Sequence, residues 1–514
     1  MRPIRLVKGF VTVGGWTLAS RILGFVRDIL IAAWLGTGPA HQAFVVAFSL
    51  PNLFRRFFAE GAFNMAFIPM FSKRLESGDD PEGFARDAFS ALGGILIVLT
   101  LLAMAAMPWM VLAMASGFYG QEQFDLAVLY GRIAFPYILF ISLAALLSGV
   151  LNAAGRFAAA AAAPVLLNVL FIAAMVGAAL TGGDLALALS WTVPVAGIAQ
   201  LALVWIAARR ANFTLVPHLP RLTPDLKRLA IIAAPAALAG GVVQVNLLVG
   251  RQVASYFDSA VSWLYNADRL YQLPLGVVAI AIGVVLLPDL SRRLKAGDEA
   301  GGRASLNRAT EFALALTLPA AAALMVIPGP LVSVLFERGA FGPQDTAQTA
   351  LAVAVYGAGL PAFVLQKVLQ PLFFARADTR RPFYYAVGAM GVNAGLAIGL
   401  APFIGFIAAA LATTAAGWAM VGQLWLGSRR MGMAATFDER LIRRAPRIVL
   451  ASALMGLCLW GGAWGLAPWL KADTLRYGAL ALLIALGIVS YFGFGHLLGA
   501  FHLSDFRNAL KRQR

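Results

Sequence analysis

Long apolar stretches separated by short polar connections recur from one end of this chain to the other. A helix of about 20 apolar residues is long enough to cross the ~30 Å hydrocarbon core of a bilayer. The pattern therefore predicts an all-α polytopic membrane protein with fourteen transmembrane helices. A shorter apolar piece at residues 330–336 is expected to form an interfacial turn or short helix. The predicted spans lie near residues 11–35, 43–72, 86–114, 124–152, 158–181, 185–208, 228–256, 259–290, 306–328, 346–375, 383–401, 404–427, 446–468 and 475–500.

The composition agrees with this pattern, because 60% of the 514 residues are hydrophobic and only 13% are charged. Soluble globular domains contain about 25% charged residues, so soluble classes are excluded. The one cysteine, Cys458, lies in an apolar run and excludes a disulfide within the chain. The four histidines lack the spacing of metal ligands, and we expect no metal site, no catalytic residues and no cofactor.

The basic residues are distributed unevenly between the connections. When the N-terminus is placed inside, alternate connections and the C-terminal tail hold thirty of the 41 lysines and arginines, and the opposite connections hold three. Cytoplasmic connections are enriched in Lys and Arg. We therefore predict that both termini are cytoplasmic, and we interpret the net charge of +17 as an orientation signal rather than a nucleic-acid-binding surface.

Eight further basic residues fall within predicted spans or at their ends, together with three clear intramembrane acids. An ionisable side chain at mid-membrane costs about 2.5–3.5 kcal/mol on insertion scales, so such residues usually face each other or a water-filled cavity. The excess of cations predicts a cavity that binds an anion. Arg132 and Arg251 lie near outer ends and are interpreted as anchors that snorkel to the interface. The other residues are Arg21, Arg27, Arg55, Arg56, Arg269, Lys367, Asp28, Glu60 and Asp268.

The chain contains an internal repeat. PMFSKRL at residues 69–75 recurs as PDLSRRL at residues 288–294, and Asn168 recurs as Asn393, 225 residues later. Parallel six-helix repeats are typical of transporters with a site between the two lobes. The predicted domains are an N-lobe at 1–215 (spans 1–6), a C-lobe at 216–430 (spans 7–12) related to it by a pseudo-two-fold axis, and a C-terminal helix pair at 431–514.

The first span carries the clearest candidate site. Arg21, Gly24 and Asp28 share one helical face, at spacings i, i+3 and i+7. Ser20, Gly24 and Arg27 share an adjoining face, and the glycine allows a ligand or backbone to approach closely. Guanidinium groups bind phosphate in a bidentate way that Lys cannot match. We predict an anion site at Arg21 and Arg27; the alternative is a structural Arg–Asp pair between helices.

Further candidates lie in the second, eighth and tenth spans. Arg56 and Glu60 stand at i and i+4 and are expected to pair, which leaves Arg55 on another face. At least one of these two arginines is predicted to face the cavity; the alternative is that one snorkels to the interface.

In the second half of the chain, Arg269 follows Asp268 in WLYNADRLYQLP, which corresponds in the repeat to the region around Arg55. We expect Arg269 to bind the anion. Lys367 stands alone in its span and either lines the second lobe or pairs locally.

Three stretches resemble the MurJ (MviN) family of lipid II flippases, in the multidrug/oligosaccharidyl-lipid/polysaccharide exporter superfamily. They are SRILGFVRD at residues 20–28, AFVVAFSLPNLFRRFFAEGAFNMAFIP at 43–69 and YNADRLYQLPLGV at 265–277, and the likeness covers the whole chain. The family's cavity arginines match Arg21, Arg27, Arg55 and Arg269, with Asp28, Arg56, Glu60 and Asp268 as matching neighbours. Ser20, Gly24 and Lys367 join them as supporting or gating residues from the helical pattern alone.

The sequence departs from the family pattern at two positions. Many relatives have an acid where this chain has Gln42 and a basic residue where it has Ser49, so the resemblance assigns no gating role to these two residues. The C-terminal pair, spans 13 and 14, is implied to form a groove for a lipid tail.

The resemblance implies an alternating-access transporter, not an enzyme, in the bacterial cytoplasmic membrane. It would carry lipid II, an undecaprenyl-pyrophosphate-linked disaccharide-pentapeptide, from the inner to the outer leaflet. The implied partners are lipid II, membrane lipids and proteins of cell-wall synthesis or division, and the chain is expected to be a monomer. Because a pyrophosphate carries about two negative charges, an inside-negative potential favours its outward movement. Coupling to this potential or to a monovalent ion is therefore expected.

Three other functions stay open. A flippase for another polyprenyl-pyrophosphate-linked glycan would share these features. A cation-coupled multidrug exporter of the same fold would have a cavity richer in acids than in arginines. A membrane enzyme acting on lipid-linked phosphate would need a catalytic acid or histidine near a membrane face and a catalytic loop, whereas the connections here are short.

Overall fold

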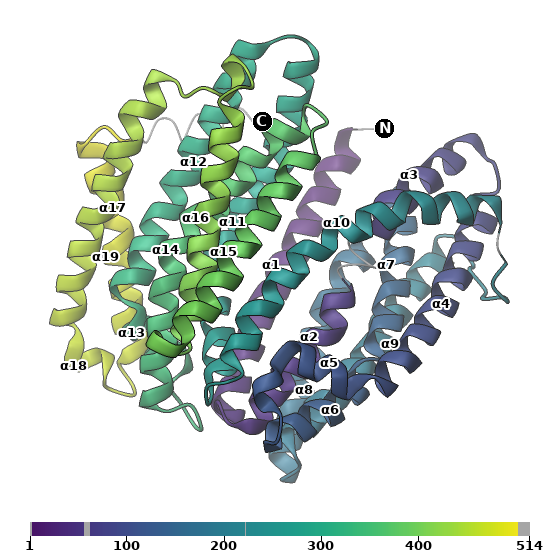
Figure 1. Ribbon diagram of the computed structural model, residues 1–514, viewed down its shortest axis with the longest axis horizontal. Coiled ribbons are helices and arrows are strands. Elements are labelled where there is room, and N and C mark those ends of the chain that lie inside the picture. Colours follow the sequence, from purple (N-terminus) through teal and green to yellow (C-terminus); the bar gives the residue numbers. More distant parts are fainter. Residues whose placement is uncertain (1–2, 56–61, 222, 502–514) are drawn as a thin grey trace. The chain divides into compact units, whose positions relative to one another are not determined.

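The computed structural model describes residues 3–55, 62–221 and 223–501, with side chains described except at 3–11, 62–65, 234–247, 277 and 279–285. Within these ranges the regular secondary structure is helical, without a strand (Figure 1). Contacts group the chain into two units, which are Met1–Ser262 with Gly339–Phe341 and Trp263–Arg338 with Gly342–Arg514.

Unit 1 holds the helices from α1 to α10. They are α1 (Pro3–Leu35), α2 (Pro39–Arg55), α3 (Ala62–Ser77), α4 (Pro81–Ala105), α5 (Met107–Ala115), η2 (Ser116–Phe118), α6 (Glu122–Ala134), α7 (Tyr137–Ala153), α8 (Ala158–Thr181), α9 (Leu185–Arg210) and α10 (Pro224–Ala254).

Unit 2 holds nearly all of α11 and the helices that follow it. They are α11 (Ala260–Lys295), α12 (Glu299–Val326), α13 (Pro328–Phe336), α14 (Pro343–Phe374), α15 (Arg380–Ile404), α16 (Ile407–Ser428), η3 (Met433–Ala435), α17 (Glu439–Gly465), α18 (Ala467–Leu470) and α19 (Arg476–Leu497).

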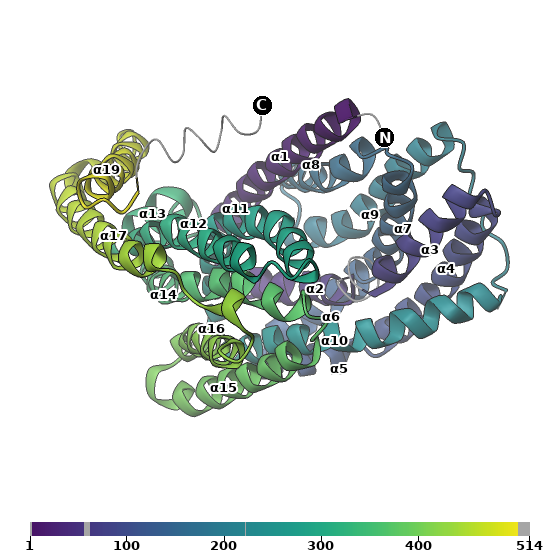
Figure 2. The ribbon, with the colours of Figure 1, turned by 90° about the horizontal axis from the view of Figure 1, so that it is seen from above.

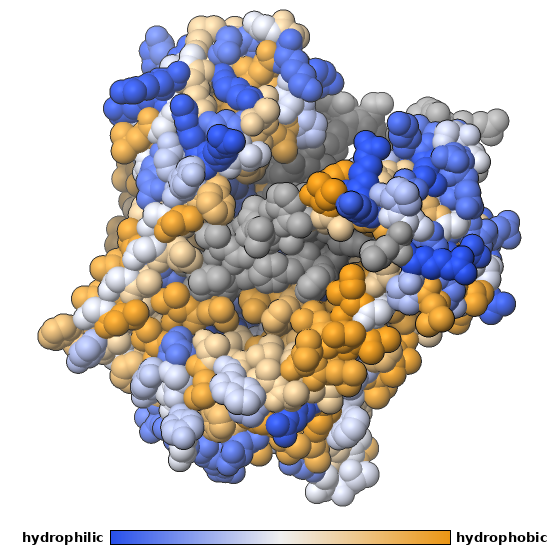
Figure 3. Space-filling model, turned by 45° about the vertical axis from the view of Figure 1, so that its right-hand side comes forward, coloured by the Kyte–Doolittle hydropathy of each residue, from blue (hydrophilic) through white to orange (hydrophobic). Residues whose placement is uncertain are grey.

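Ten helical segments of the described chain are long and apolar enough to cross a membrane, and they coincide with ten of the predicted spans. On the face drawn in Figure 3, hydrophobic residues cover broad areas, and hydrophilic residues gather mainly toward the upper and lower parts of the view. The other four predicted spans fall on α1, on α2 with α3, on α10 and on α11, each of which includes residues whose side chains are not described. The total of fourteen therefore stays a prediction. The apolar piece at 330–336 forms the short helix α13, as predicted.

α4 and α12 both follow a glycine at corresponding positions, which supports the internal repeat, although the aspartate that caps each helix lies at a different distance from that glycine. Gly78 and Gly297, at corresponding positions, adopt positive φ angles of +72° and +73°, a conformation that suits glycine. Asp80 and Asp298 then cap the two helices, accepting hydrogen bonds at 2.9 Å and 2.8 Å from the backbone N–H three residues ahead. The arrangement of the repeat as two six-helix lobes stays a prediction.

α10 packs against α3 and α5 within unit 1. Near its start, the Arg74 guanidinium donates to the Asp225 carboxylate at 2.7 Å. Near its end, the Gln252 side-chain amide donates to the Ser116 hydroxyl at 2.6 Å. The contacts thus group α10 with the helices that precede it, whereas the predicted lobe boundary at 215/216 was drawn from the repeat, so that boundary stays a prediction.

Connections of unit 2 that the charge pattern assigns to one side meet at one end of the unit. Arg303 and Arg376 each donate to a backbone carbonyl in the connection 429–438, at 2.5 and 2.6 Å. Beyond the other end of α12, Arg476 donates to the Glu337 carbonyl at 3.1 Å. This separation supports the prediction that successive connections lie at opposite ends of the helices. It does not test the prediction that the end of unit 2 rich in arginine is cytoplasmic.

The C-terminal helices are an integral part of unit 2. α17 packs against both α12 and α19, and Figure 2 shows the three helices beside one another. Their common core includes Ala315 of α12, Met455 and Leu459 of α17, and Leu483 and Tyr491 of α19. The helix pair predicted at 431–514 therefore shares its hydrophobic core with α12.

Candidate functional site

Arg27 and Asp28 form a buried ion pair within α1. Only 8% of the surface of Arg27 and 3% of that of Asp28 is exposed. Arg27 Nε and Nη2 both donate to Asp28 Oδ1, at 3.0 and 2.7 Å. A buried charge without such a partner would carry a large desolvation cost. The alternative of a structural Arg–Asp pair was thus close to what is observed, although the pair joins neighbours on one helix rather than two helices.

Asn168 of α8 links the Arg27 guanidinium to the backbone of α1 at Ser20. Arg27 Nη1 donates to Asn168 Oδ1 at 2.9 Å, and Asn168 Nδ2 donates to the Ser20 carbonyl at 2.9 Å. A Cβ atom on Gly24 would come within 3.4 Å of Asn168 Nδ2, so the glycine allows this amide to approach α1. Sequence reasoning marked Asn168 only as a repeat position and missed this contact.

Aromatic rings complete the surroundings of Arg27. Its guanidinium carbon lies 5.5 Å from the ring centroid of Phe171, a distance typical of a cation–π contact. Phe171 of α8 packs in turn against Phe44 and Phe48 of α2, with centroids 6.3 and 5.6 Å apart. Arg27 therefore lies where α1, α2 and α8 meet.

Arg21 differs from Arg27 in its surroundings. It is half-buried, and within the described part of the chain it makes no hydrogen bond or ion pair. It lies on α1 less than two turns before Arg27 and next to Ser20, whose hydroxyl accepts a hydrogen bond from Asn168 at 3.4 Å. Among the predicted site residues of unit 1 that the structure describes, Arg21 is the one whose charge is least compensated.

Arg55 borders a cavity of about 190 Å³ inside unit 1. Its Nε donates to the Asn52 side chain at 3.2 Å. Residues from α3, α7, α8 and α9 line the same cavity, and Ser148, Asn152 and Gln200 give it polar groups. The predicted partners Arg56 and Glu60 lie outside the described residues, so their pairing stays a prediction.

The remaining predicted residues belong to unit 2. Arg269 stacks over the ring of Tyr265, with 4.4 Å from the guanidinium carbon to the centroid. Asp268 accepts a hydrogen bond from the Gln272 side chain. Lys367 is exposed on α14 and has no hydrogen bond or ion pair within the described ranges. The joining of these residues with those of unit 1 into one site stays a prediction.

The two positions that depart from the family pattern carry neutral side chains on α2. Gln42 is buried. Ser49 donates to the Val45 carbonyl at 2.6 Å, one turn back along its own helix. Neither residue is ionisable, so no charged pair can form between them.

Unit 2 also contains an apolar cavity of about 260 Å³ between α12, α17 and α19. Leu316, Pro319, Met455, Leu459 and Ile488 are among the residues that line it. Residue periodicity gave no sign of this cavity, and only the family resemblance implied a groove at the C-terminal pair. No group of His, Cys, Asp and Glu side chains in the described chain has the arrangement of a metal site.

Comparisons with known proteins agree on one family. The sequence model of the family described as "Lipid II flippase MurJ" matches residues 31–484. The "Probable lipid II flippase MurJ" of Rhizobium tropici is 44% identical, over 99% of this chain and 97% of its own length. The "Lipid II flippase MurJ" of Burkholderia cenocepacia is 35% identical, over 99% of this chain and 100% of its own length.

Solved structures show the same fold at lower identity. A structure of "Lipid II flippase MurJ, inward closed conformation" matches 95% of this chain and 98% of its own, with a TM-score of 0.80 and 24% identity. An inward-facing multidrug resistance MATE transporter of the MOP superfamily matches 82% of this chain and 98% of its own, with a TM-score of 0.70 and 12% identity.

Replacing Asn168 by alanine is expected to destabilise the protein. The change removes an acceptor from the Arg27 guanidinium and a donor from the Ser20 carbonyl, and a buried polar group left unsatisfied costs about 1–3 kcal/mol. The measurement is the thermal unfolding midpoint of the purified protein in detergent. Val169→Ala, at an exposed position next along α8, is the control; equal midpoints for the two variants would contradict the role assigned to Asn168.

Proposed function

Because this chain belongs to the MurJ family of lipid II flippases, we propose that it moves lipid II from the inner to the outer leaflet of the bacterial cytoplasmic membrane. The observation that carries the proposal is the family match over residues 31–484, with relatives aligned over nearly their whole length. The members of this family are named as flippases, which are transporters and not enzymes. The many long apolar helices suit a multi-pass protein of that membrane.

We propose that arginines bind the pyrophosphate of lipid II. Arg21 supports this role best, because no described residue compensates its charge. Arg55 borders a cavity that includes the polar side chains of Asn152 and Gln200, and Arg269 stacks over an aromatic ring. Bidentate hydrogen bonds from guanidinium groups to phosphate oxygens would give both strength and orientation. Arg27 joins this set with its guanidinium already held by Asp28 and Asn168, so it also fixes the position of α1 relative to α8.

The lipid tail would occupy the apolar cavity of unit 2. Its walls come from α12, α17 and α19, so they include both helices of the C-terminal pair. An undecaprenyl chain is purely hydrocarbon, and burial of apolar surface stabilises it by about 25 cal/mol per Å². We therefore propose that the arginines bind the charged headgroup and that the apolar cavity binds the tail.

Transport is proposed to proceed by alternating access of a cationic cavity between two lobes, with both termini cytoplasmic and the chain acting as a monomer. Partners among cell-wall synthesis or division proteins are part of the same proposal. The multidrug-exporter alternative is less well supported, because basic residues outnumber acids in the predicted spans, and the likeness to MATE transporters concerns the fold alone. A flippase for another polyprenyl-pyrophosphate-linked glycan is the remaining candidate.

Loss of Arg21 or Arg269 is expected to prevent flipping. In cells depleted of their own lipid II flippase, wild type should restore the amount of lipid II that a membrane-impermeant probe can reach. Arg21→Ala and Arg269→Ala should each lower that amount about tenfold or more, because a hydrogen bond to a charged group contributes about 1.5–3 kcal/mol. Arg132→Ala is the control, because that exposed arginine donates to the Met104 carbonyl outside the site.

Each outcome of this assay has a distinct meaning. Full restoration by the two variants at normal expression would contradict the assignment of the binding arginines while leaving flipping intact. If wild type itself leaves the distribution of lipid II unchanged, the substrate is another lipid-linked glycan.

Flipping is expected to depend on the membrane potential. Outward movement of an anion gains about 2.3 kcal/mol per charge per 100 mV when the inside is negative. Dissipating the potential, with the sodium and proton gradients held constant, should therefore reduce the rate at which lipid II reaches the outer leaflet. A rate that falls only when the sodium gradient is removed would instead assign the coupling to a monovalent ion.

Filling the apolar cavity is expected to impair transport of long-chain lipid. Ala320 lines the cavity, and Ala320→Phe should lower the flipping rate roughly tenfold if the tail loses burial of about two methylene groups at ~0.8 kcal/mol each. A short-chain analogue of lipid II should be flipped by wild type and variant at equal rates. Leu457→Phe, at an exposed position of α17, is the control; equal losses with both chain lengths would contradict a tail site.

A further inference from the structure

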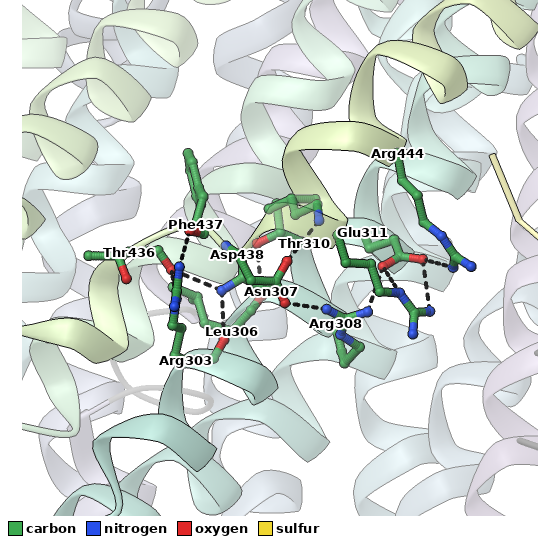
Figure 4. A network of polar contacts seen from close by, with 12 residues as sticks. Arg303, Leu306, Asn307, Arg308, Thr310, Glu311, Thr436, Phe437, Asp438 and Arg444 are labelled. Atoms are coloured by element: carbon green, nitrogen blue, oxygen red, sulfur yellow. Dashed lines mark hydrogen bonds and ion pairs between the residues drawn. The ribbon is translucent and has the colours of Figure 1, made fainter. Parts of the chain in front are cut away.

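A cluster of arginines surrounds one buried carboxylate where α12 meets the start of α17 (Figure 4). The side chain of Glu311 is 12% exposed. It accepts hydrogen bonds from Arg444 Nη1 at 2.5 Å, from Arg440 Nε at 3.1 Å and from Arg308 Nη1 at 3.0 Å. Three guanidinium groups thus converge on a carboxylate that can balance only one of them.

The connection before α17 holds this cluster in a defined position. Asp438 caps α17 by accepting from Leu441 N at 2.7 Å, and it also pairs with Arg308. Asn307 accepts from Asp438 N at 3.0 Å and donates to the Thr436 carbonyl at 2.9 Å. The side chains around Glu311 therefore project from two helices that are fixed to each other.

The surface around the cluster carries an excess of positive charge. Among the described residues 299–311 and 438–447, which form these two helix ends, six arginines stand against four acids, which leaves a surplus of two positive charges. Much of the surplus faces outward, because the side chains of Arg308 and Arg440 are 37% and 45% exposed. The six arginines are Arg303, Arg308, Arg440, Arg443, Arg444 and Arg447, and the four acids are Glu299, Glu311, Asp438 and Glu439.

The cluster adjoins the apolar cavity of unit 2. Ala315 lines the cavity and lies one helical turn beyond Glu311 on α12. Tyr491, another lining residue, donates from its hydroxyl to the Ala315 carbonyl at 2.6 Å. A basic surface and an apolar cavity one turn apart are complementary to an amphiphile with an anionic head and a hydrocarbon chain.

The charge pattern predicts that this end of unit 2 is cytoplasmic. The cytoplasmic leaflet presents anionic lipids, and basic clusters between or beside transmembrane helices on that side are suited to their headgroups. The arginines around Glu311 are partly compensated by it, which suits a single phosphate better than the more highly charged pyrophosphate.

We propose that Arg308, Arg440 and Arg444, arranged around Glu311, form a binding site for an anionic glycerophospholipid of the inner leaflet, with an acyl chain directed toward the cavity between α12, α17 and α19. The headgroup site is separate from the arginines proposed to bind substrate, whereas the acyl chain would share the cavity proposed for the tail of lipid II. The test of the headgroup site does not depend on flipping.

The test is titration of the purified full chain, in micelles of a neutral detergent, with phosphatidylglycerol or with phosphatidylcholine, and measurement of bound lipid by native mass spectrometry. Wild type should bind phosphatidylglycerol in preference to phosphatidylcholine. Arg440→Gln and Arg308→Gln should each weaken the binding of phosphatidylglycerol about fivefold, the effect of one basic residue near an anionic headgroup.

Arg443→Gln is the matched control. Arg443 lies three residues from Arg440 on α17 and loses the same charge in the variant, but its side chain is 72% exposed and pairs with Glu439 rather than Glu311. It should retain the affinity of wild type. Equal weakening by Arg440→Gln and Arg443→Gln, or equal binding of the two phospholipids, would overturn the proposal. Displacement of phosphatidylglycerol by undecaprenyl phosphate at far lower concentration would also overturn it and assign the cluster to the substrate.

Discussion

A guanidinium group on a helix inside a bilayer must be held by polar partners or kept in contact with water, because the hydrocarbon around the helix offers neither charge nor hydrogen bonds. The packing around Arg27 in unit 1 follows from this constraint. Arg27 reaches a carboxylate on its own helix, an amide on α8 and a ring beside it. The helices α1 and α8 pack closely where Gly24 leaves room for that amide. The hydrogen bonds that one buried guanidinium requires thus fix how α1 and α8 pack against each other.

The same constraint has a different solution at the basic end of unit 2. There the carboxylate of Glu311 is the buried group, and arginines from two helices reach it from a region where their remaining charge is accessible. Removing a partner from a buried charge is costly, whereas an exposed pair contributes about 0–1 kcal/mol. The cluster around Glu311 therefore joins α12 to α17 through its buried member, and the exposed guanidinium groups keep their capacity for an external anion.

The sequence was sufficient for the elements whose cause is local. Ten apolar spans and the short helix α13 follow from the length of apolar runs. The partners of individual side chains were harder to predict from the sequence. Helical periodicity grouped Asp28 with Arg21, but an arginine side chain is long enough to fold back onto the next residue, which is what Arg27 does. The cavity between α12, α17 and α19 depends on how three distant segments pack, which the spacing of apolar residues along each helix does not show.

Asn168 and Asn393 illustrate how a duplicated scaffold can acquire different uses. Both amides are buried, at corresponding places in α8 and α15, and a buried amide must find partners wherever it lies. In unit 1 this requirement is met in part by Arg27, so the amide also orients a cation. Unit 1 carries three of the four arginines matched to the family's cavity, and unit 2 carries only Arg269. The buried amide is thus present in both units, whereas the matched arginines are distributed unequally between them.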